Sequence, residues 1–229
     1  MTLCAQYTDN MKLLIKYPTR KRPDQFLSTL RRTYDMATDK ANIHFLISYD
    51  LDDTTMTPEL IDSATINYPC TFIGGHPESK IEACNRDIND FTGEWDILLL
   101  LSDDMICQKK GWDNLIRKAI GTDTDKCLHY SDGYVGARLQ TMYIAGRKYY
   151  ERLKYIYHPQ YTSLFCDNEQ MQVAKLLNKY IYSPVCLFKH EHYSNNSQVK
   201  MDELMKLNES YYSDDKRTFE RRKRNNFDL

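Results

Sequence analysis

The chain has 229 residues, of which 41% are hydrophobic and 28% charged, and its 31 basic side chains nearly balance 32 acidic ones. This composition is typical of a soluble globular protein and argues against a disordered or fibrous chain. The small net charge points to no particular class of partner.

The seven cysteines are scattered and form no Cys-x-x-Cys pair, so the sequence predicts neither a zinc motif nor a redox motif. The N-terminal stretch MTLCAQYTDN lacks the basic and apolar regions of a signal peptide. No apolar run approaches the roughly 18 residues that a membrane span requires. We therefore expect a cytoplasmic protein with reduced thiols.

The first half of the chain alternates apolar runs with helical patterns, which predicts a parallel, doubly wound α/β sheet. The unbroken leucines near residue 100 are typical of a central strand that is covered on both faces. Strands are expected at 12–18, 42–50, 70–75 and 95–101, and helices at 23–37, 58–67 and 79–93.

The second half is less regular, and no linker separates it from the first. We predict one catalytic domain over residues 1–194, followed by a polar, basic helical extension over 195–229. Residues 216–224 carry six basic side chains and one Glu, so the net charge of this segment is +5. The net charge of the rest of the chain is therefore about −6. Strands are expected at 126–133, 138–146 and 179–190, and helices at 111–120, 149–155 and 167–180.

The stretch LLLLSDDMIC, residues 98–107, places two acidic residues directly after a buried strand. Ligands of open α/β sheets bind beyond the carboxyl ends of the strands. We therefore expect Asp103 and Asp104 to face a binding crevice. The alternative is that both carboxylates only cap the turn into the next element.

These features resemble the nucleotide-sugar glycosyltransferases of the GT-A fold. The resemblance spans roughly residues 11–193 and implies a doubly wound, mostly parallel central sheet flanked by helices. It depends on PTRKRP after the first strand, an acidic turn after the second, SKIEACNRDINDFTGEWDILLLLSDD, CDNEQ and KHEHY.

The resemblance implies a divalent cation, Mn²⁺ or Mg²⁺, held by hard oxygen ligands against the diphosphate of the donor. Asp104 would ligate the metal directly, and Asp103 would contact the ribose or the metal. His190 or His192 would supply a further ligand. The chain departs from the usual Asp-x-Asp motif of the family, because no acidic residue stands at Leu101 or Ser102.

The resemblance also implies a nucleotide-sugar donor, by default a UDP-sugar. Asp50 or Asp52 would contact the uracil or the ribose. Lys80 and Asn85 would approach the nucleotide and the donor sugar, although each also suits an ordinary surface position. The remaining nucleotide contacts would come from the loop after the first strand, at Thr19, Arg20 and Arg22, whereas Lys21 fits a solvated turn better.

A second acidic site, FCDNEQ, lies at an expected helix start, where carboxylates also serve as caps. In the family, an acid at this place accepts the proton of the acceptor hydroxyl. Asp167 or Glu169 would be that base, and the spacing does not decide between them. A base at this position implies inversion of the anomeric configuration.

The acceptor is left open between a glycan and a hydroxymethylated base in DNA, as in bacteriophage enzymes. The basic extension is compatible with phosphate contacts but equally with a solvated helix. Two other functions compete: a nucleotidyltransferase, whose glycine-rich signature PTRKRP lacks, and a non-catalytic nucleic-acid-binding protein. The oligomeric state cannot be predicted from the sequence.

Overall fold

The computed structural model describes residues 10–76, 78–192 and 200–229. In this part of the chain, seven strands form one sheet in the order β3-β2-β1-β4-β7-β6-β8, and β5 pairs with β9 in a separate ribbon. The strands are β1 (Leu13–Thr19), β2 (Ile43–Asp50), β3 (Cys70–Gly75), β4 (Ile97–Leu100), β5 (Met105–Cys107), β6 (Cys127–Ser131), β7 (Ile144–Gly146), β8 (Tyr180–Cys186) and β9 (Phe188–His190).

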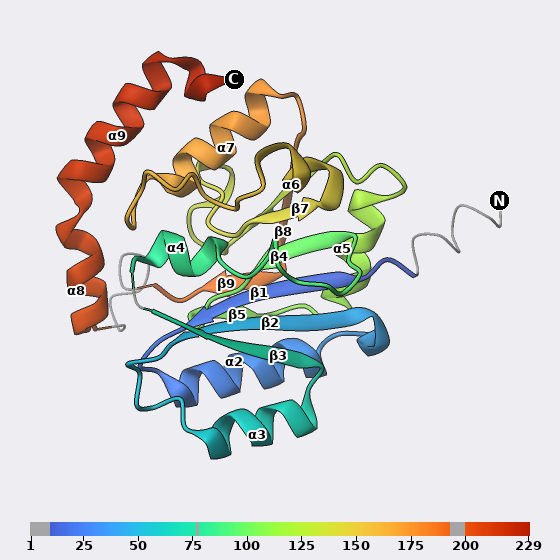
Figure 1. Ribbon diagram of the computed structural model, residues 1–229. Coiled ribbons are helices and arrows are strands. Elements are labelled where there is room, and N and C mark those ends of the chain that lie inside the picture. The colour runs from blue at the N-terminus through green and yellow to red at the C-terminus, as the bar shows by residue number, and fades with distance from the viewer. Residues whose placement is uncertain (1–9, 77, 193–199) are drawn as a thin grey trace, which may run out of the picture.

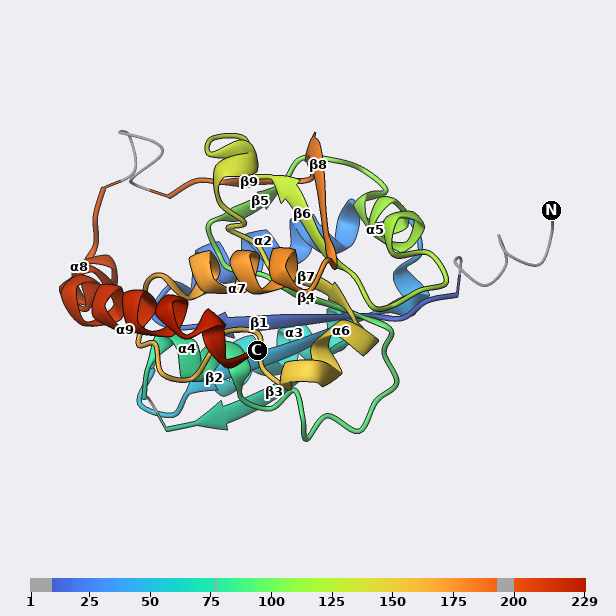
Figure 2. The ribbon, with the colours of Figure 1, turned by 90° about the horizontal axis from the view of Figure 1, so that it is seen from above.

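Helices cover both faces of the sheet (Figures 1 and 2). They are α2 (Pro23–Asp35), α3 (Pro58–Asn67), α4 (Lys80–Asn85), α5 (Trp112–Ile120), α6 (Arg147–Leu153), α7 (Cys166–Leu176), α8 (Glu203–Ser210) and α9 (Tyr212–Arg224). One hydrophobic cluster joins the sheet to α2, α3 and α5, and a second joins it to α4, α6 and α7. The predicted fold class is thus confirmed.

Parallel pairing places the carboxyl ends of four strands at one edge of the sheet. β1 pairs in parallel with β2 on one side and with β4 on the other, and β2 pairs in parallel with β3. β4 supplies the buried leucines, as expected for a strand covered on both faces. Segments that follow β1, β2 and β4 therefore meet at this edge.

The prediction of one helix over 79–93 is wrong, because α4 ends at Asn85. Beyond it the chain turns towards Lys16, a fully buried residue of β1. The ammonium of Lys16 donates to the Arg86 carbonyl at 2.8 Å and to the hydroxyl of Ser48, which in turn donates to Asp87. Asp87 adopts a left-handed conformation with φ of 71°. A buried ammonium must have hydrogen-bond acceptors, and the chain supplies them here by leaving the helical conformation that its pattern predicts. Burial also lowers the pKa of Lys16 to about 8.

The strand predicted at 138–146 is also shorter than expected and is confined to β7. The carboxylate of Asp132 accepts backbone N–H bonds from Tyr134, Val135 and Gly136, which folds the preceding segment into a loop. The run 179–190 likewise divides into β8 and β9, with Leu187 between them.

The C-terminal helices α8 and α9 lie along one side of the molecule (Figure 1). Phe219 of α9 and Phe227 join the hydrophobic cluster that contains α4, α6 and α7. The domain boundary predicted at residue 194 lies outside the described residues. None of the helices in the described part of the chain is long and apolar enough to cross a membrane.

Candidate active site

The loops after β1 and β2 are joined by Arg20. Its guanidinium lies 2.7 Å from the carboxylate of Asp50 and contacts both oxygens of Asp52, at 2.6 and 2.9 Å. The bond to Arg20 lowers the pKa of Asp52. Three of the residues predicted to contact the nucleotide therefore lie together. Thr19 is also at this edge, and its buried hydroxyl has no hydrogen-bond partner among the described residues.

Arg86 completes this group and was not predicted from the sequence. Its NH2 group donates to the carbonyl of Tyr49 at 2.7 Å and to Asp50 at 3.3 Å. It packs over the end of β3, where a Cβ added to Gly75 would lie 2.7 Å from the guanidinium. The glycine pair that ends β3 was the available signal for such a close approach.

Asp103 faces Arg22 in this structure. Oδ1 of Asp103 lies 3.0 Å from Nη1 of Arg22, and Nη2 of the same guanidinium lies 2.6 Å from the carboxylate of Asp202, the N-cap of α8. The Asp103 side chain is 13% exposed. Burial raises the pKa of Asp103 to about 6, against the opposing charge of Arg22.

Asp104 faces His190. The β5–β9 ribbon places His190 opposite Met105, and Nε2 of His190 lies 3.4 Å from Oδ2 of Asp104. The hydroxyl of Ser102 donates to the other carboxylate oxygen at 2.5 Å. Burial would raise the pKa of Asp104, but the contacts with His190 and Ser102 outweigh it and lower the pKa below the ordinary value.

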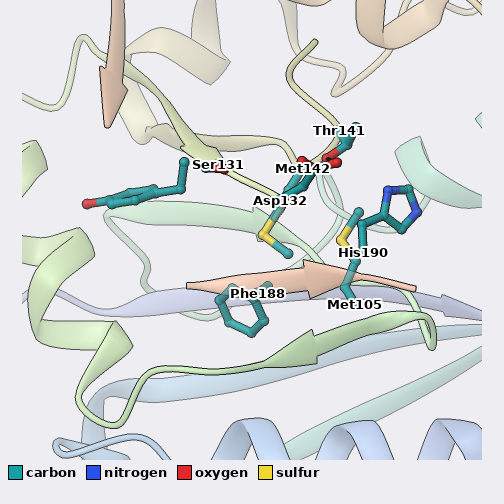
Figure 3. Close-up of a pocket in the computed structure, with 8 residues that line it drawn as sticks. Met105, Ser131, Asp132, Thr141, Met142, Phe188 and His190 are labelled. Atoms are coloured by element: carbon teal, nitrogen blue, oxygen red, sulfur yellow. Dashed lines mark hydrogen bonds between the residues drawn. The ribbon is translucent and has the colours of Figure 1, made fainter. Parts of the chain in front are cut away.

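His192 lies beside His190, with 5.4 Å between the ring centroids. Burial lowers the pKa of His192, which favours the neutral imidazole that can ligate a metal. His190 also lines a small cavity with Ser131, Asp132 and Thr141 (Figure 3).

The pair formed by Asp104 and His190 fits a divalent cation. Among the described residues, no group of three His, Cys, Asp or Glu side chains is already arranged around one point. In an octahedral site with ligands at about 2.1 Å from the metal, neighbouring ligand atoms lie about 3 Å apart. This spacing is close to the 3.4 Å between Nε2 of His190 and Oδ2 of Asp104. Nδ1 of His190 is buried without a hydrogen-bond partner among the described residues. Ser131, Asp132 and Thr141 in the cavity wall are polar neighbours of the kind that the second nitrogen of a metal-binding histidine uses.

Lys80 and Asp167 extend this group. Lys80 is the first residue of α4 and Asp167 the second of α7. Desolvation would lower the pKa of Lys80, but the Cys166 and Cys84 thiols and the Asp167 and Asp104 carboxylates raise it. Burial raises the pKa of Asp167, and the charge of Lys80 opposes this rise. The Lys80 ammonium therefore interacts electrostatically with the Asp104 and Asp167 carboxylates, and Asp167 also interacts with the His190 imidazole.

Two predicted site residues are engaged elsewhere. Glu169 is 3% exposed and forms a forked ion pair with Arg222, at 2.8 and 2.9 Å, while the hydroxyl of Tyr161 donates to it at 2.7 Å. The Asn85 amide accepts from the backbone N–H groups of Ile156 and Tyr157, at 2.9 and 3.0 Å, and donates to the Tyr157 carbonyl. Of the two candidate bases, only Asp167 is among the groups that raise the pKa of Lys80.

Comparisons of sequence give no match, either to protein-family models or to curated proteins. Comparison with solved structures does give matches. The mannosyltransferase PcManGT from Pyrobaculum calidifontis, solved with GDP-Man and Mn²⁺, matches with a TM-score of 0.64 and 12% identity over 87% of this chain and 69% of that one.

TarS from S. aureus is similar as well. Its residues 1–349, solved with UDP-GlcNAc, match with a TM-score of 0.63 and 13% identity over 86% of this chain and 61% of that one. The same segment with UDP gives a TM-score of 0.60 at 12% identity, over 78% and 60%. The chain thus spans about three fifths of the TarS segment. At this identity the likeness concerns the fold, and the chain has the mostly parallel α/β fold of these glycosyltransferase structures.

Proposed function

We propose that this protein is a metal-dependent, inverting glycosyltransferase that moves one sugar from a nucleotide-sugar to an acceptor hydroxyl. The observation that carries the proposal is the approach of His190 to Asp104, with 3.4 Å between Nε2 and Oδ2, beyond the carboxyl end of β4 in a glycosyltransferase-like sheet. Lys80 and Asp167 lie near enough to affect each other's pKa. The solved relatives bind GDP-Man with Mn²⁺, UDP and UDP-GlcNAc, which supports a nucleotide-sugar donor.

The nucleoside would lie against the loops joined by Arg20. The carboxylate of Asp50, held by Arg20 and Arg86, is an acceptor for the N–H of a base, and Asp52 is an acceptor for ribose hydroxyls. The ring N–H of a uracil fits this acceptor, and TarS was solved with UDP and with UDP-GlcNAc, so we propose UDP as the nucleotide. Thr19 adds a hydroxyl at the same edge.

Asp104 and His190 would hold Mn²⁺ or Mg²⁺, with the remaining positions open to phosphate oxygens and water. The cation would neutralise charge on the departing diphosphate. Lys80 offers a second positive charge there and remains protonated, because the neighbouring Cys166 and Cys84 thiols and the Asp167 and Asp104 carboxylates raise its pKa. Arg22, held between Asp103 and Asp202, lies at the same strand ends.

Asp167 would act as the general base. The acceptor oxygen forms a bond to the anomeric carbon while the bond from that carbon to the diphosphate oxygen breaks, and the hydroxyl proton passes to the Asp167 carboxylate. The electron pair of the broken bond leaves with the nucleoside diphosphate. This single displacement inverts the anomeric configuration, and the raised pKa of Asp167 suits proton transfer.

The acceptor would be a glycan hydroxyl or the hydroxyl of a hydroxymethylated base in DNA. Five basic residues on the outer face of α9 offer contacts to an anionic acceptor. They are Lys216, Arg217, Arg221, Lys223 and Arg224.

Thermal denaturation with UDP and GDP, each with and without Mn²⁺, tests the donor assignment. A nucleotide present at about 100 times its Kd stabilises the folded state by about 2.7 kcal/mol, which is a rise in Tm of about 5 to 10 °C for a chain of this size. We expect this rise with UDP and Mn²⁺ together. If neither nucleotide raises the Tm under any condition, the donor assignment is wrong.

A further inference from the structure

We propose that helix α9 positions the base: Asp215 and Arg222 hold the two ends of the segment 161–169, which carries Asp167. The inference rests on the proposed function for its catalytic consequence, but the structural hold can be measured without it. Helix α9 would thus have a structural role in addition to any contact that its basic residues make.

Asp215 holds the segment that precedes α7. Its carboxylate accepts three consecutive backbone N–H groups, from Thr162 at 2.9 Å, Ser163 at 2.8 Å and Leu164 at 2.7 Å. Asp215 is only 2% exposed. Backbone amides at this depth need acceptors, and hydrogen bonds to a charged acceptor are stronger than those to a neutral one. This carboxylate therefore fixes the path of the chain into α7.

Arg222 holds the first turn of α7 itself. Its guanidinium is 4% exposed and forms the forked ion pair with Glu169, while NH1 lies 2.7 Å from Asp228. A planar fork fixes both the distance and the orientation of its partner. Because Glu169 lies one half-turn of helix beyond Asp167, fixing Glu169 also fixes the orientation of Asp167 about the helix axis.

Between these two anchors the backbone adopts a disfavoured conformation. Phe165 has a φ of 60°, in the left-handed region that a bulky residue rarely occupies. Its ring stacks on Phe219 of α9 with 5.8 Å between centroids and contacts Tyr212 at 5.2 Å. Such a conformation persists only when its surroundings hold it, and here α9 supplies the contacts.

The three inward residues of α9 lie on one helical face. Asp215, Phe219 and Arg222 are spaced at i, i+4 and i+7, and all three are buried. Asp214 and Arg217 lie on the outer face, where they pair with each other and their side chains are 69% and 79% exposed. The helix thus presents a structural face to α7 and a charged face to solvent.

The substitution Asp215→Asn tests the inference, and Asp214→Asn on the outer face of the same helix is its matched control. An amide offers one acceptor oxygen in place of two, so some of the three backbone N–H groups lose their partner. We expect hydrogen exchange at 162–169 to become about tenfold faster or more, with exchange in β1, β2 and β4 unchanged. Asp214→Asn should leave exchange at 162–169 as in the native protein.

For transfer, we expect Asp215→Asn to lower kcat by about tenfold or more, because the base is misplaced, while KM for the donor stays within about twofold. A loss of general stability would also speed hydrogen exchange in β1, β2 and β4, whereas a positioning role lowers kcat while that exchange stays unchanged. Asp215→Glu, which keeps the carboxylate, should restore part of kcat.

The variant Arg222→Lys guards against failure of Asp215→Asn to fold, since it keeps the charge but loses the fork. We again expect a lower kcat with little change in the KM for the donor. Unchanged exchange at 162–169 in the folded variants would overturn the inference, and so would native kcat. If exchange accelerates but the native protein transfers no sugar, the hold by α9 stands and the proposed function fails.

Discussion

Nε2 of His190 lies 3.4 Å from Oδ2 of Asp104, although His190 ends β9 and Asp104 lies in the turn before β5, far away in the sequence. The β5–β9 ribbon makes this approach possible, because its antiparallel register pairs Met105 with His190. The acidic residues that follow β4 thereby lie beside an imidazole that β9 supplies.

We predict that Asp104→Asn abolishes metal-dependent transfer while the fold is retained. An amide is a weak metal ligand, so we expect kcat/KM at saturating Mn²⁺ to fall by more than about a hundredfold. Initial rates measured across a Mn²⁺ titration check this, with circular dichroism to confirm folding. Asp214→Asn, at an exposed position, serves as the control, and near-native rates in Asp104→Asn would contradict the assignment.

We predict that the pH profile of kcat/KM has an acidic limb above the ordinary range of an aspartate. The base must be ionised to accept a proton, and burial raises the pKa of Asp167. Lys80 opposes that rise, so Lys80→Met should move the limb to higher pH in addition to lowering the rate. The profile is measured from about pH 4 to 9, and a limb that stays in place in Lys80→Met would show that Asp167 is not the titrating base.

Asp103 should make unfolding depend on pH. Its pKa is raised from 3.8 to about 6 by burial, so the folded protein holds a proton that the unfolded chain releases. The contribution of Asp103 to the free energy of unfolding is therefore greatest below pH 3.8 and is lost as the pH rises to about 6. Urea denaturation of the metal-free protein between these values measures it.

The variant Asp103→Asn isolates this effect from the other carboxyl groups. The difference in unfolding free energy between the native protein and the variant should shrink with rising pH across that window and then level off. A difference that does not vary with pH would show that Asp103 is ionised throughout.

Arg20→Lys should weaken donor binding more than turnover. A lysine cannot bridge Asp50 and Asp52 as the guanidinium does. We expect the Kd for UDP to rise about tenfold, which is about 1.4 kcal/mol, with kcat within about threefold at saturating donor. Calorimetric titration checks this, with Arg31→Lys, an exposed site, as the control. An unchanged Kd would remove Arg20 from the nucleotide site.

The alternation of strands and helices could be predicted because its signals are local. Pro23 and Pro58 begin α2 and α3 as expected, and the apolar run before Asp103 forms the central strand. The end of α4 could not be predicted in this way. It depends on Lys16, a residue far from α4 in the sequence that must satisfy its buried ammonium.

The site residues likewise fall into some that the sequence pattern predicts and others that depend on contacts with distant segments. Acidic residues at strand ends could be predicted from the topology of α/β sheets. The engagement of Glu169, on which our proposal of Asp167 as the base rests, could not be predicted, because it depends on Arg222, which pairs with Glu169 from α9. Arg86 was missed because the pattern placed it inside a longer helix. Contacts between distant segments decided each of these cases.

The dependence of α7 on α9 also bears on how the protein is made. Chains fold from the N-terminus as they leave the ribosome, and β1 to β4 precede α9 in the sequence. The strand ends that would receive the donor can thus assemble during synthesis, whereas the first turn of α7, which carries Asp167, gains its anchors only when α9 has emerged. Competence for proton transfer would therefore be acquired later in synthesis than the fold of the donor site.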